Sequence, residues 1–215
     1  MNPLLLPRRH ALLTLGAALL LAGRSALAGA PTKSQAAVGK PAPAFSVIDS
    51  AMKTRTLAEF KGKTVVLEWT SPSCPFAKAQ YDAGRMQALQ KWSAGHGIVW
   101  LTVLSSHPTR SDYLEPAKAE AFNRGRSGVP AALLIDASGE VGHAYGAMTA
   151  NHMFIVDKRG VLAYAGGIDD GEAMNAKEVL RAHNHVRPAL DDLLAGRPVK
   201  TPVTEPSGCA LAYAS

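Results

Sequence analysis

The most constraining feature of the sequence is the segment VVLEWTSPSCPFAKAQY, in which a strand-like run leads into a helix-like run. Residues 65–70 are mostly apolar or β-branched, which is typical of a buried strand. Pro75 suits the first turn of a helix, where its missing N–H costs no hydrogen bond. Cys74 lies at the junction, where free backbone N–H groups and the helix dipole stabilise a thiolate. This position predicts a reactive sulfur, with a structural or buried thiol as the alternative.

The rest of the chain alternates between strand and helix patterns. Strands are predicted at 44–48, 65–70, 98–105 and 131–135, and a hairpin at 153–156 and 161–164. Helical patterns cover one turn at 57–60, then 76–95, 115–126, 141–145 and 175–195. Pro188 predicts a kink or a break in the last of these, whose expected buried face is Val179, Val186, Leu190, Leu193 and Leu194. This order indicates an α/β fold with one mixed sheet between helical layers, a C-terminal β-hairpin and a closing helix. Cys74 follows the carboxyl end of a strand, where sites form in such folds.

The N-terminus has the pattern of an export signal. Arg8 and Arg9 precede the short apolar run Ala11–Ala22, and Ala26–Ala28 offers small residues for cleavage. The apolar run is shorter than the roughly 20 residues of a membrane span. We therefore expect residues 1–28 to be a signal peptide, of the twin-arginine or the general secretory type, and the mature protein to be periplasmic or secreted. Contact with the membrane is expected only through this segment, before cleavage.

The mature chain has the length of one domain. Residues 29–37 read as a linker, 38–197 as the folded domain and 198–215 as an extended, proline-containing tail. Removal of the signal peptide takes away three arginines and lowers the formal charge from +6 to +3. The remaining basic residues form short, separated clusters, so no nucleic-acid partner is expected. The two cysteines, Cys74 and Cys209, are too few for a cysteine metal cluster, and in an exported protein they are compatible with a structural disulfide.

Taken together, the Ser-Pro-Ser-Cys-Pro-Phe junction, the later hairpin and the ending Gly166-Gly167-Ile168-Asp169-Asp170 resemble the thioredoxin fold. More narrowly, the chain resembles the peroxiredoxin-like branch of the alkyl hydroperoxide reductase/thiol-specific antioxidant family. The opening 38–45, the segment 57–63 and the tail motif 207–210 match the usual pattern of that branch. The resemblance extends from about Val38 to Tyr213 and implies a redox enzyme that needs no cofactor or metal.

The sequence departs from the family patterns at three places. Thioredoxins carry Cys-x-x-Cys, but Ser71 stands three residues before Cys74. Peroxiredoxins place a proline where Leu67 stands, and Ser71 then occupies their hydroxyl position. The family's Thr-Pro pair, whose peptide bond is cis, is replaced by Ala150-Asn151, where a cis bond would cost about 2.5–4 kcal/mol. We therefore expect a trans or reshaped loop there.

The resemblance implies a peroxidase cycle. Cys74 would attack a peroxide and become a sulfenic acid, with Ser71 orienting the substrate. Pro75, Asn151 and His152 are expected at the substrate site, and His152 would lower the thiol pKa or shuttle a proton unless it merely packs. Arg124 and Arg126 are the candidates for the family's pocket arginine.

Cys209 has three readings: a resolving cysteine, a permanent disulfide partner, or a free tail residue. The expected partners are a peroxide or a protein disulfide together with an external thiol donor. The alternatives to peroxide reduction are thiol–disulfide exchange and a non-catalytic binding module held by a Cys74–Cys209 disulfide.

Overall fold

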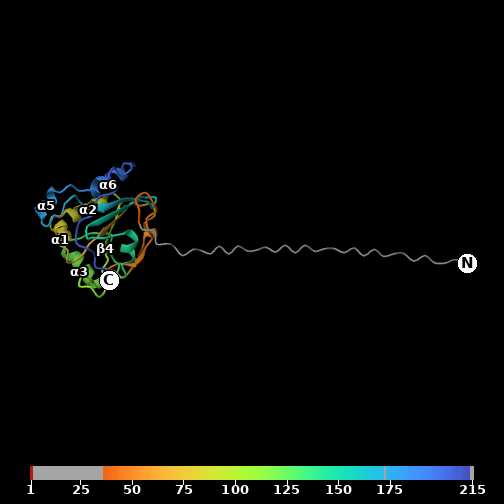
Figure 1. The fold of residues 1–215 in the computed structure, drawn as a ribbon, viewed down its shortest axis with the longest axis horizontal. Coiled ribbons are helices and arrows are strands. Elements are labelled where there is room, and N and C mark those ends of the chain that lie inside the picture. Colours follow the sequence, from red (N-terminus) through yellow and green to blue (C-terminus); the bar gives the residue numbers. More distant parts are fainter. Residues whose placement is uncertain (2–35, 172, 214–215) are drawn as a thin grey trace. The chain divides into compact units, whose positions relative to one another are not determined.

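The computed structural model describes residues 1, 36–171 and 173–213 (Figure 1). The predicted signal peptide and most of the linker lie outside these residues. The core is a five-stranded sheet with the order β5-β4-β3-β6-β7. Strands β3 (Val65–Trp69), β4 (Val99–Leu104) and β5 (Ala132–Ile135) run parallel, and β6 (His152–Val156) and β7 (Leu162–Gly167) add an antiparallel hairpin. The predicted mixed sheet is confirmed.

The two faces of the sheet have separate apolar cores, and residue parity along the strands assigns each side chain to one of them. Val65, Leu67 and Trp69 belong to one core, which includes Tyr145 of α4 (Glu140–Tyr145). Val66 belongs to the other, which is covered by helices α1 (Pro75–Asp82), α2 (Arg85–Gly95) and α6 (Val186–Leu194). Helix α3 (Pro116–Gly125) packs against the edge strand β5 and its neighbour β4. In Figure 1, α1, α2, α5 and α6 lie together, away from the N-terminal strands drawn in orange.

Two long helical patterns are interrupted in the structure. The helix predicted at 76–95 is two helices, because Gly84 has a left-handed φ of 72° and begins α2. The helix predicted at 175–195 divides into α5 (Ala176–Arg181) and α6, so the predicted break is present. It falls before Pro188, which lies in the first turn of α6, where its missing N–H is tolerated. Leu194 is 39% exposed, so its expected burial is wrong.

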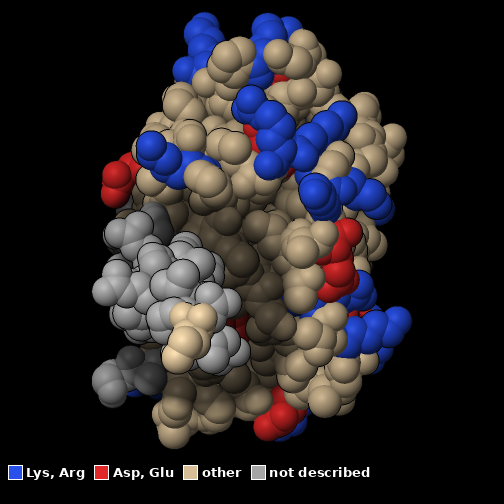
Figure 2. All heavy atoms as spheres, turned by 90° about the vertical axis from the view of Figure 1, so that its right-hand side faces the viewer, with Lys and Arg blue, Asp and Glu red and all other residues tan. Residues whose placement is uncertain are grey.

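The first strand is shorter than predicted and has a partner that the sequence did not suggest. Strand β1 (Ser46–Ile48) pairs antiparallel with β2 (Thr54–Thr56), and the single turn η1 (Leu57–Phe60) follows as predicted. None of the helices in the described part of the chain is both long and apolar enough to cross a membrane. On the face shown in Figure 2, most Lys and Arg side chains gather in the upper half.

A buried carboxylate lies in the middle of the sheet, six residues before Cys74. Glu68 is fully buried, and its two oxygens accept hydrogen bonds from four side chains: Tyr81, Gln90, Trp100 and Thr102. Tyr81 comes from α1 and Gln90 from α2, so the network fastens both helices to the sheet. Burial and the nearby Glu68 carboxylate raise the pKa of Tyr81 well above its usual value, so its hydroxyl remains a donor.

We expect Glu68→Ala to lower the free energy of unfolding by about 3–5 kcal/mol, because it leaves four buried donors without their acceptor. Urea unfolding at pH 7 measures this loss. Glu205→Ala, at an exposed position, is the control and should change the value by less than about 0.5 kcal/mol. A loss below about 1 kcal/mol for Glu68→Ala would contradict the role given to the network.

Candidate functional site

Cys74 occupies the N-cap position of α1, as the sequence predicts. Its backbone is extended (φ −81°, ψ 115°), and Pro75 follows in the first turn of the helix. The free N–H groups of that turn point toward the N-cap, which favours negative charge on a sulfur there. Cys74 is 1% exposed in this disulfide-bonded form. Its nearest apolar neighbours include Ala77, which stands where a Cys-x-x-Cys pair starting at Cys74 would have its second cysteine.

Cys74 and Cys209 form a disulfide across 135 residues of chain. Their Cα atoms lie 5.6 Å apart, which is ordinary disulfide geometry. The Cys209 N–H also donates to the Cys74 sulfur at 3.3 Å. The reading of Cys209 as a free tail residue is therefore wrong. The disulfide is compatible with both remaining readings of Cys209, as a resolving cysteine and as a permanent disulfide partner.

The segment 201–213, which we call the tail strap, lies along the domain and brings Cys209 to Cys74. It bridges Ala165 of β7 through Val203, then Thr149 through Ala210 and Ser106 through Ala212. Three backbone hydrogen bonds fix the part around Cys209: Ala150 N–H to Cys209 O, Leu211 N–H to Met148 O, and His107 N–H to Ala212 O, at 2.8–3.0 Å. The strap is thus an extended segment that covers the site, as its prolines suggested.

Ser71 lies near Cys74 in the chain, but its hydroxyl has another partner. It donates to a carboxylate oxygen of Asp112, which also accepts from Ser73 at 2.9 Å. The two serines and Asp112 tie the loop before α1 to the loop after β4. Asp112 was missed from the sequence, because nothing in its exposed, irregular loop indicates which strand end it faces. In this form Ser71 acts on the loop and not on the sulfur.

Asn151 lies at the start of β6, next to the strand end that precedes Cys74. Its N–H donates to Trp69 O at 2.8 Å, and its φ of 68° is left-handed, which asparagine tolerates better than most residues. No peptide bond in the described part of the chain is cis, as expected for Ala150-Asn151. The Asn151 side-chain oxygen is buried without a hydrogen-bond partner. Of the two expectations for this loop, trans or reshaped, the trans peptide bond is what the structure shows.

His152 is a packed residue and does not supply positive charge to the thiol. Its Nδ1 accepts from the Met148 N–H at 3.3 Å, and its ring lies 4.3 Å from that of Phe154. Burial lowers its pKa to about 4, so the imidazole is neutral at pH 7. A neutral ring does not lower the thiol pKa by positive charge, so that part of the expectation for His152 is wrong.

The two candidate arginines differ in position. Arg124 is exposed and lies 3.8 Å from Glu120 on its own helix. Arg126 stacks over the rings of Tyr81 at 3.8 Å and Phe122 at 4.3 Å, and donates to the Thr70 hydroxyl at 3.0 Å. Thr70 directly precedes Ser71, so the structure brings Arg126, and not Arg124, to the strand end that carries the site. Its Nε and one terminal nitrogen are buried without a hydrogen-bond partner.

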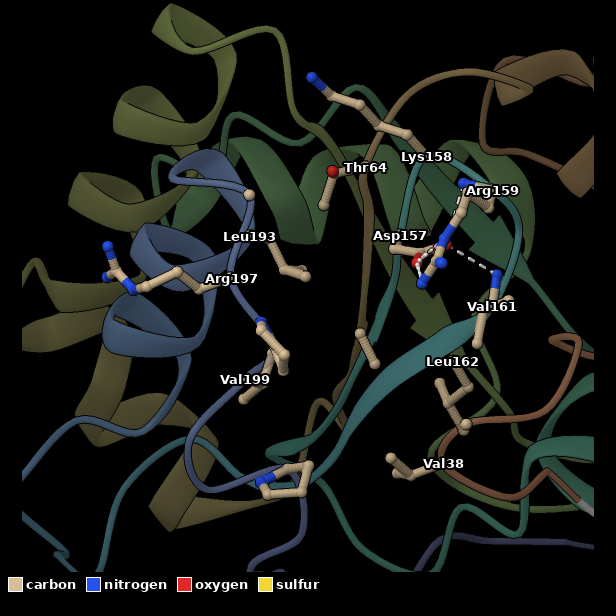
Figure 3. A pocket seen from close by; sticks show the side chains of 15 residues that line it. Val38, Thr64, Asp157, Lys158, Arg159, Val161, Leu162, Leu193, Arg197 and Val199 are labelled. Atoms are coloured by element: carbon tan, nitrogen blue, oxygen red, sulfur yellow. Dashed lines mark hydrogen bonds and ion pairs between the residues drawn. The ribbon is translucent and has the colours of Figure 1, made fainter.

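A cavity of about 620 Å³ lies elsewhere on the domain (Figure 3). Leu193 and Val199 face Val38 and Leu162 across it, and an Asp157–Arg159 ion pair of 2.8 Å stands at its rim. Thr64, which precedes β3, lines this cavity, whereas Cys74 follows the other end of that strand. None of the predicted site residues lines the cavity. Within the described ranges, no cluster of His, Cys, Asp and Glu could hold a metal.

We expect His152 to make stability depend on pH. A histidine in the unfolded chain has a pKa of about 6.5, against about 4 for folded His152, so the unfolded chain takes up the proton first. Its contribution, up to about 3 kcal/mol, is complete above pH 6.5 and is lost as the pH falls toward 4. Urea unfolding between pH 4.5 and 7 should show a shallower pH dependence in His152→Asn. Exposed His183→Asn should retain the wild-type dependence; equal curves for all three proteins would contradict this.

Comparisons with known proteins agree with this geometry. Residues 38–165 match the model of the AhpC/TSA family. An uncharacterized conserved protein from Geobacillus kaustophilus has a TM-score of 0.72 and 23% identity, over 83% of this chain and 93% of that one. A hypothetical protein from Sinorhizobium meliloti has a TM-score of 0.68 and 25% identity, over 85% and 97%.

A structure assigned as a thiol:disulfide interchange protein DsbE, from Chlorobium tepidum, has a TM-score of 0.54 and 15% identity, over 75% and 98%. At that identity it supports the fold alone. A search of curated proteins gave no match. The family match covers more than half of the chain, and the sheet order and the N-cap cysteine agree with it. This chain is a member of the AhpC/TSA family with a thioredoxin-like fold.

Proposed function

We propose that this protein is an exported thiol-dependent oxidoreductase that reduces peroxides through Cys74, with Cys209 as its resolving cysteine. The observation that carries the proposal is the bond between a sulfur at a helix N-terminus and a cysteine on a separately fastened tail. A helix N-terminus stabilises the thiolate that attacks, and also the thiolate that leaves when the disulfide is reduced.

The cycle has three balanced steps. The Cys74 thiolate attacks the terminal peroxide oxygen, the O–O bond breaks, the alcohol or water leaves, and Cys74 becomes a sulfenic acid. The Cys209 thiol then displaces the sulfenic oxygen as water, which forms the Cys74–Cys209 disulfide seen here. An external thiol donor supplies two electrons and returns both cysteines to thiols.

Other chain groups support this cycle indirectly. Pro75 is the first residue of the helix that Cys74 caps, and the bond between Ser71 and Asp112 fixes the loop before that helix. Asn151 and His152 follow Ala150, which packs with Cys74, and carry a buried oxygen without a partner and a neutral ring. Arg126 is the guanidinium nearest in position to the strand end, through its bond to Thr70.

Export is part of the proposal because of the N-terminal pattern. Arg8, Arg9 and the apolar run that follows are typical of a signal peptide of the twin-arginine or general secretory type. A disulfide between the two cysteines is expected to persist in an oxidising compartment, such as the periplasm or the medium. We assign residues 1–28 to the signal, 29–37 to a linker, 38–197 to the domain and 198–215 to the tail.

Thiol–disulfide exchange is a second candidate. Its support is the strap, an extended segment that carries a cysteine and is held at the site by backbone hydrogen bonds to residues 148–150 and 106–107. A substrate protein in disulfide exchange would likewise present a cysteine on an extended segment.

The Cys209→Ser protein separates these functions from a structural disulfide. With stoichiometric peroxide, Cys74 should be trapped by dimedone as a sulfenic acid, because no resolving thiol competes for it. Mass spectrometry locates the adduct, and Cys74→Ser, which should remain unlabelled, is the control.

If Cys74 reacts with a model protein disulfide but not with peroxide, the second candidate replaces the first. If Cys74 reacts with neither, and Cys209→Ser only lowers stability by about 2–5 kcal/mol, the disulfide is structural.

A further inference from the structure

The tail strap is held at its end by an aromatic side chain that is independent of the disulfide. Tyr213 stacks on the His143 ring, with centroids 4.2 Å apart, and its hydroxyl donates to Ala147 O at 2.8 Å. The Arg110 guanidinium donates to Tyr213 O at 3.2 Å. Four residues after Cys209, the chain is thus anchored to α4 and to the loop after β4.

Two glycines shape the slot that receives this ring. A Cβ at Gly142 would overlap the Tyr213 hydroxyl, and a Cβ at Gly139 would lie 2.8 Å from the Tyr213 ring. Gly142 lies inside α4, where its φ is not left-handed and alanine would be the better helix former. The absence of a side chain there is explained by the close approach of Tyr213.

A second anchor lies five residues before Cys209. Thr204 exchanges a hydrogen bond with the Tyr164 hydroxyl at 2.6 Å and accepts from the Gly167 N–H at 3.0 Å. A Cβ at Gly166 would overlap the Thr204 hydroxyl. Cys209 therefore lies on a short segment that non-covalent contacts fasten at both ends.

We propose that Tyr213 is a positioning residue, which keeps Cys209 beside Cys74 after the disulfide is reduced. Reduction breaks the S–S bond but leaves the stacked ring, its hydroxyl bond and the Thr204 contacts intact. A segment held at both ends keeps its thiol at a higher effective concentration than one held at a single end. The inference rests on the proposed function, because it concerns the step in which Cys209 condenses with the Cys74 sulfenic acid and water leaves.

The test measures the effective concentration of Cys209 directly. The full chain is equilibrated with reduced and oxidised glutathione. In this equilibrium the protein dithiol reacts with glutathione disulfide to give the protein disulfide and two molecules of reduced glutathione. We expect Tyr213→Ala to lower the equilibrium constant for disulfide formation about tenfold, as expected for the loss of one stacked ring and one hydrogen bond. Tyr213→Phe retains the stacked ring and loses only the hydroxyl bond, so its loss should be smaller, about threefold.

Gly142→Ala tests the same anchor from the opposite side. The new Cβ should expel the Tyr213 ring from its slot while the sequence of the strap stays wild type, so this variant should reproduce the tenfold loss. The double variant should lose no more than either single variant, because both remove one contact. Gly95→Ala, also in a helix but with no atom within 4 Å of its Cβ, is the matched control and should equal wild type.

A kinetic readout keeps the inference distinct from the proposed function. In Tyr213→Ala, peroxide should oxidise Cys74 at the wild-type rate, but dimedone should capture more of the sulfenic acid because Cys209 resolves it more slowly. If wild-type Cys74 does not react with peroxide, the peroxidase proposal fails, while the glutathione result still decides the role of Tyr213.

Three results would overturn the inference. The first is an equilibrium constant unchanged in Tyr213→Ala. The second is a loss in Tyr213→Ala that Gly142→Ala does not reproduce. The third is fast hydrogen exchange of the Leu211 amide in the reduced wild-type protein, which would mean that the strap detaches when the disulfide opens; this amide bonds to Met148 O in the oxidised form.

Discussion

Strand β3 lies at the centre of the sheet, and all five of its residues are buried. Both of its edges are paired, with β4 on one side and β6 on the other, and both of its faces are covered by apolar side chains. A slip of one residue would exchange the two faces and bring Glu68 out of its network, so the register is fixed. Cys74 lies five residues after the end of this strand, and the bonds of Ser71 and Ser73 to Asp112 hold the loop between them. The Asn151 N–H, which donates to Trp69 O, connects the loop opposite Cys74 to the same strand end.

The tail strap is bonded to Cys74, near the carboxyl end of β3. It contributes the second sulfur from 135 residues away, and its backbone pairs with strand β7, with the loop before β6 and with the loop after β4. Besides these backbone contacts, the strap is held by the disulfide, by Thr204 in the Gly166 slot and by Tyr213 in the Gly142 slot. In the proposed cycle, a tail held in this way supplies both a bond that opens chemically and a partner thiol that remains in place.

Most of the sheet could be predicted from the sequence, because the strand runs are buried on both faces and therefore continuously apolar. The turn at 57–60, the hairpin and the N-cap position of Cys74 were also predicted, since each has a local cause in turn residues or proline. Strand β2 was missed because Thr54–Thr56 has no apolar pattern. The division between α1 and α2 was missed because helical periodicity continues across Gly84, whose left-handed backbone interrupts the helix.

The sequence by itself determined the α/β architecture, the strand that carries Cys74 and the helix that begins there, because these follow from local periodicity and from the chemistry of proline and cysteine. Only the tertiary structure decided how the site is composed. It joined Cys209 to Cys74, gave the Ser71 hydroxyl to Asp112, packed His152 as a neutral ring and placed Tyr213 against Gly142. The disulfide, the Ser71–Asp112 bond and the Tyr213–Gly142 contact join residues 41 to 135 positions apart. Each depends on where two distant segments pass each other in space, which no local pattern of residues encodes.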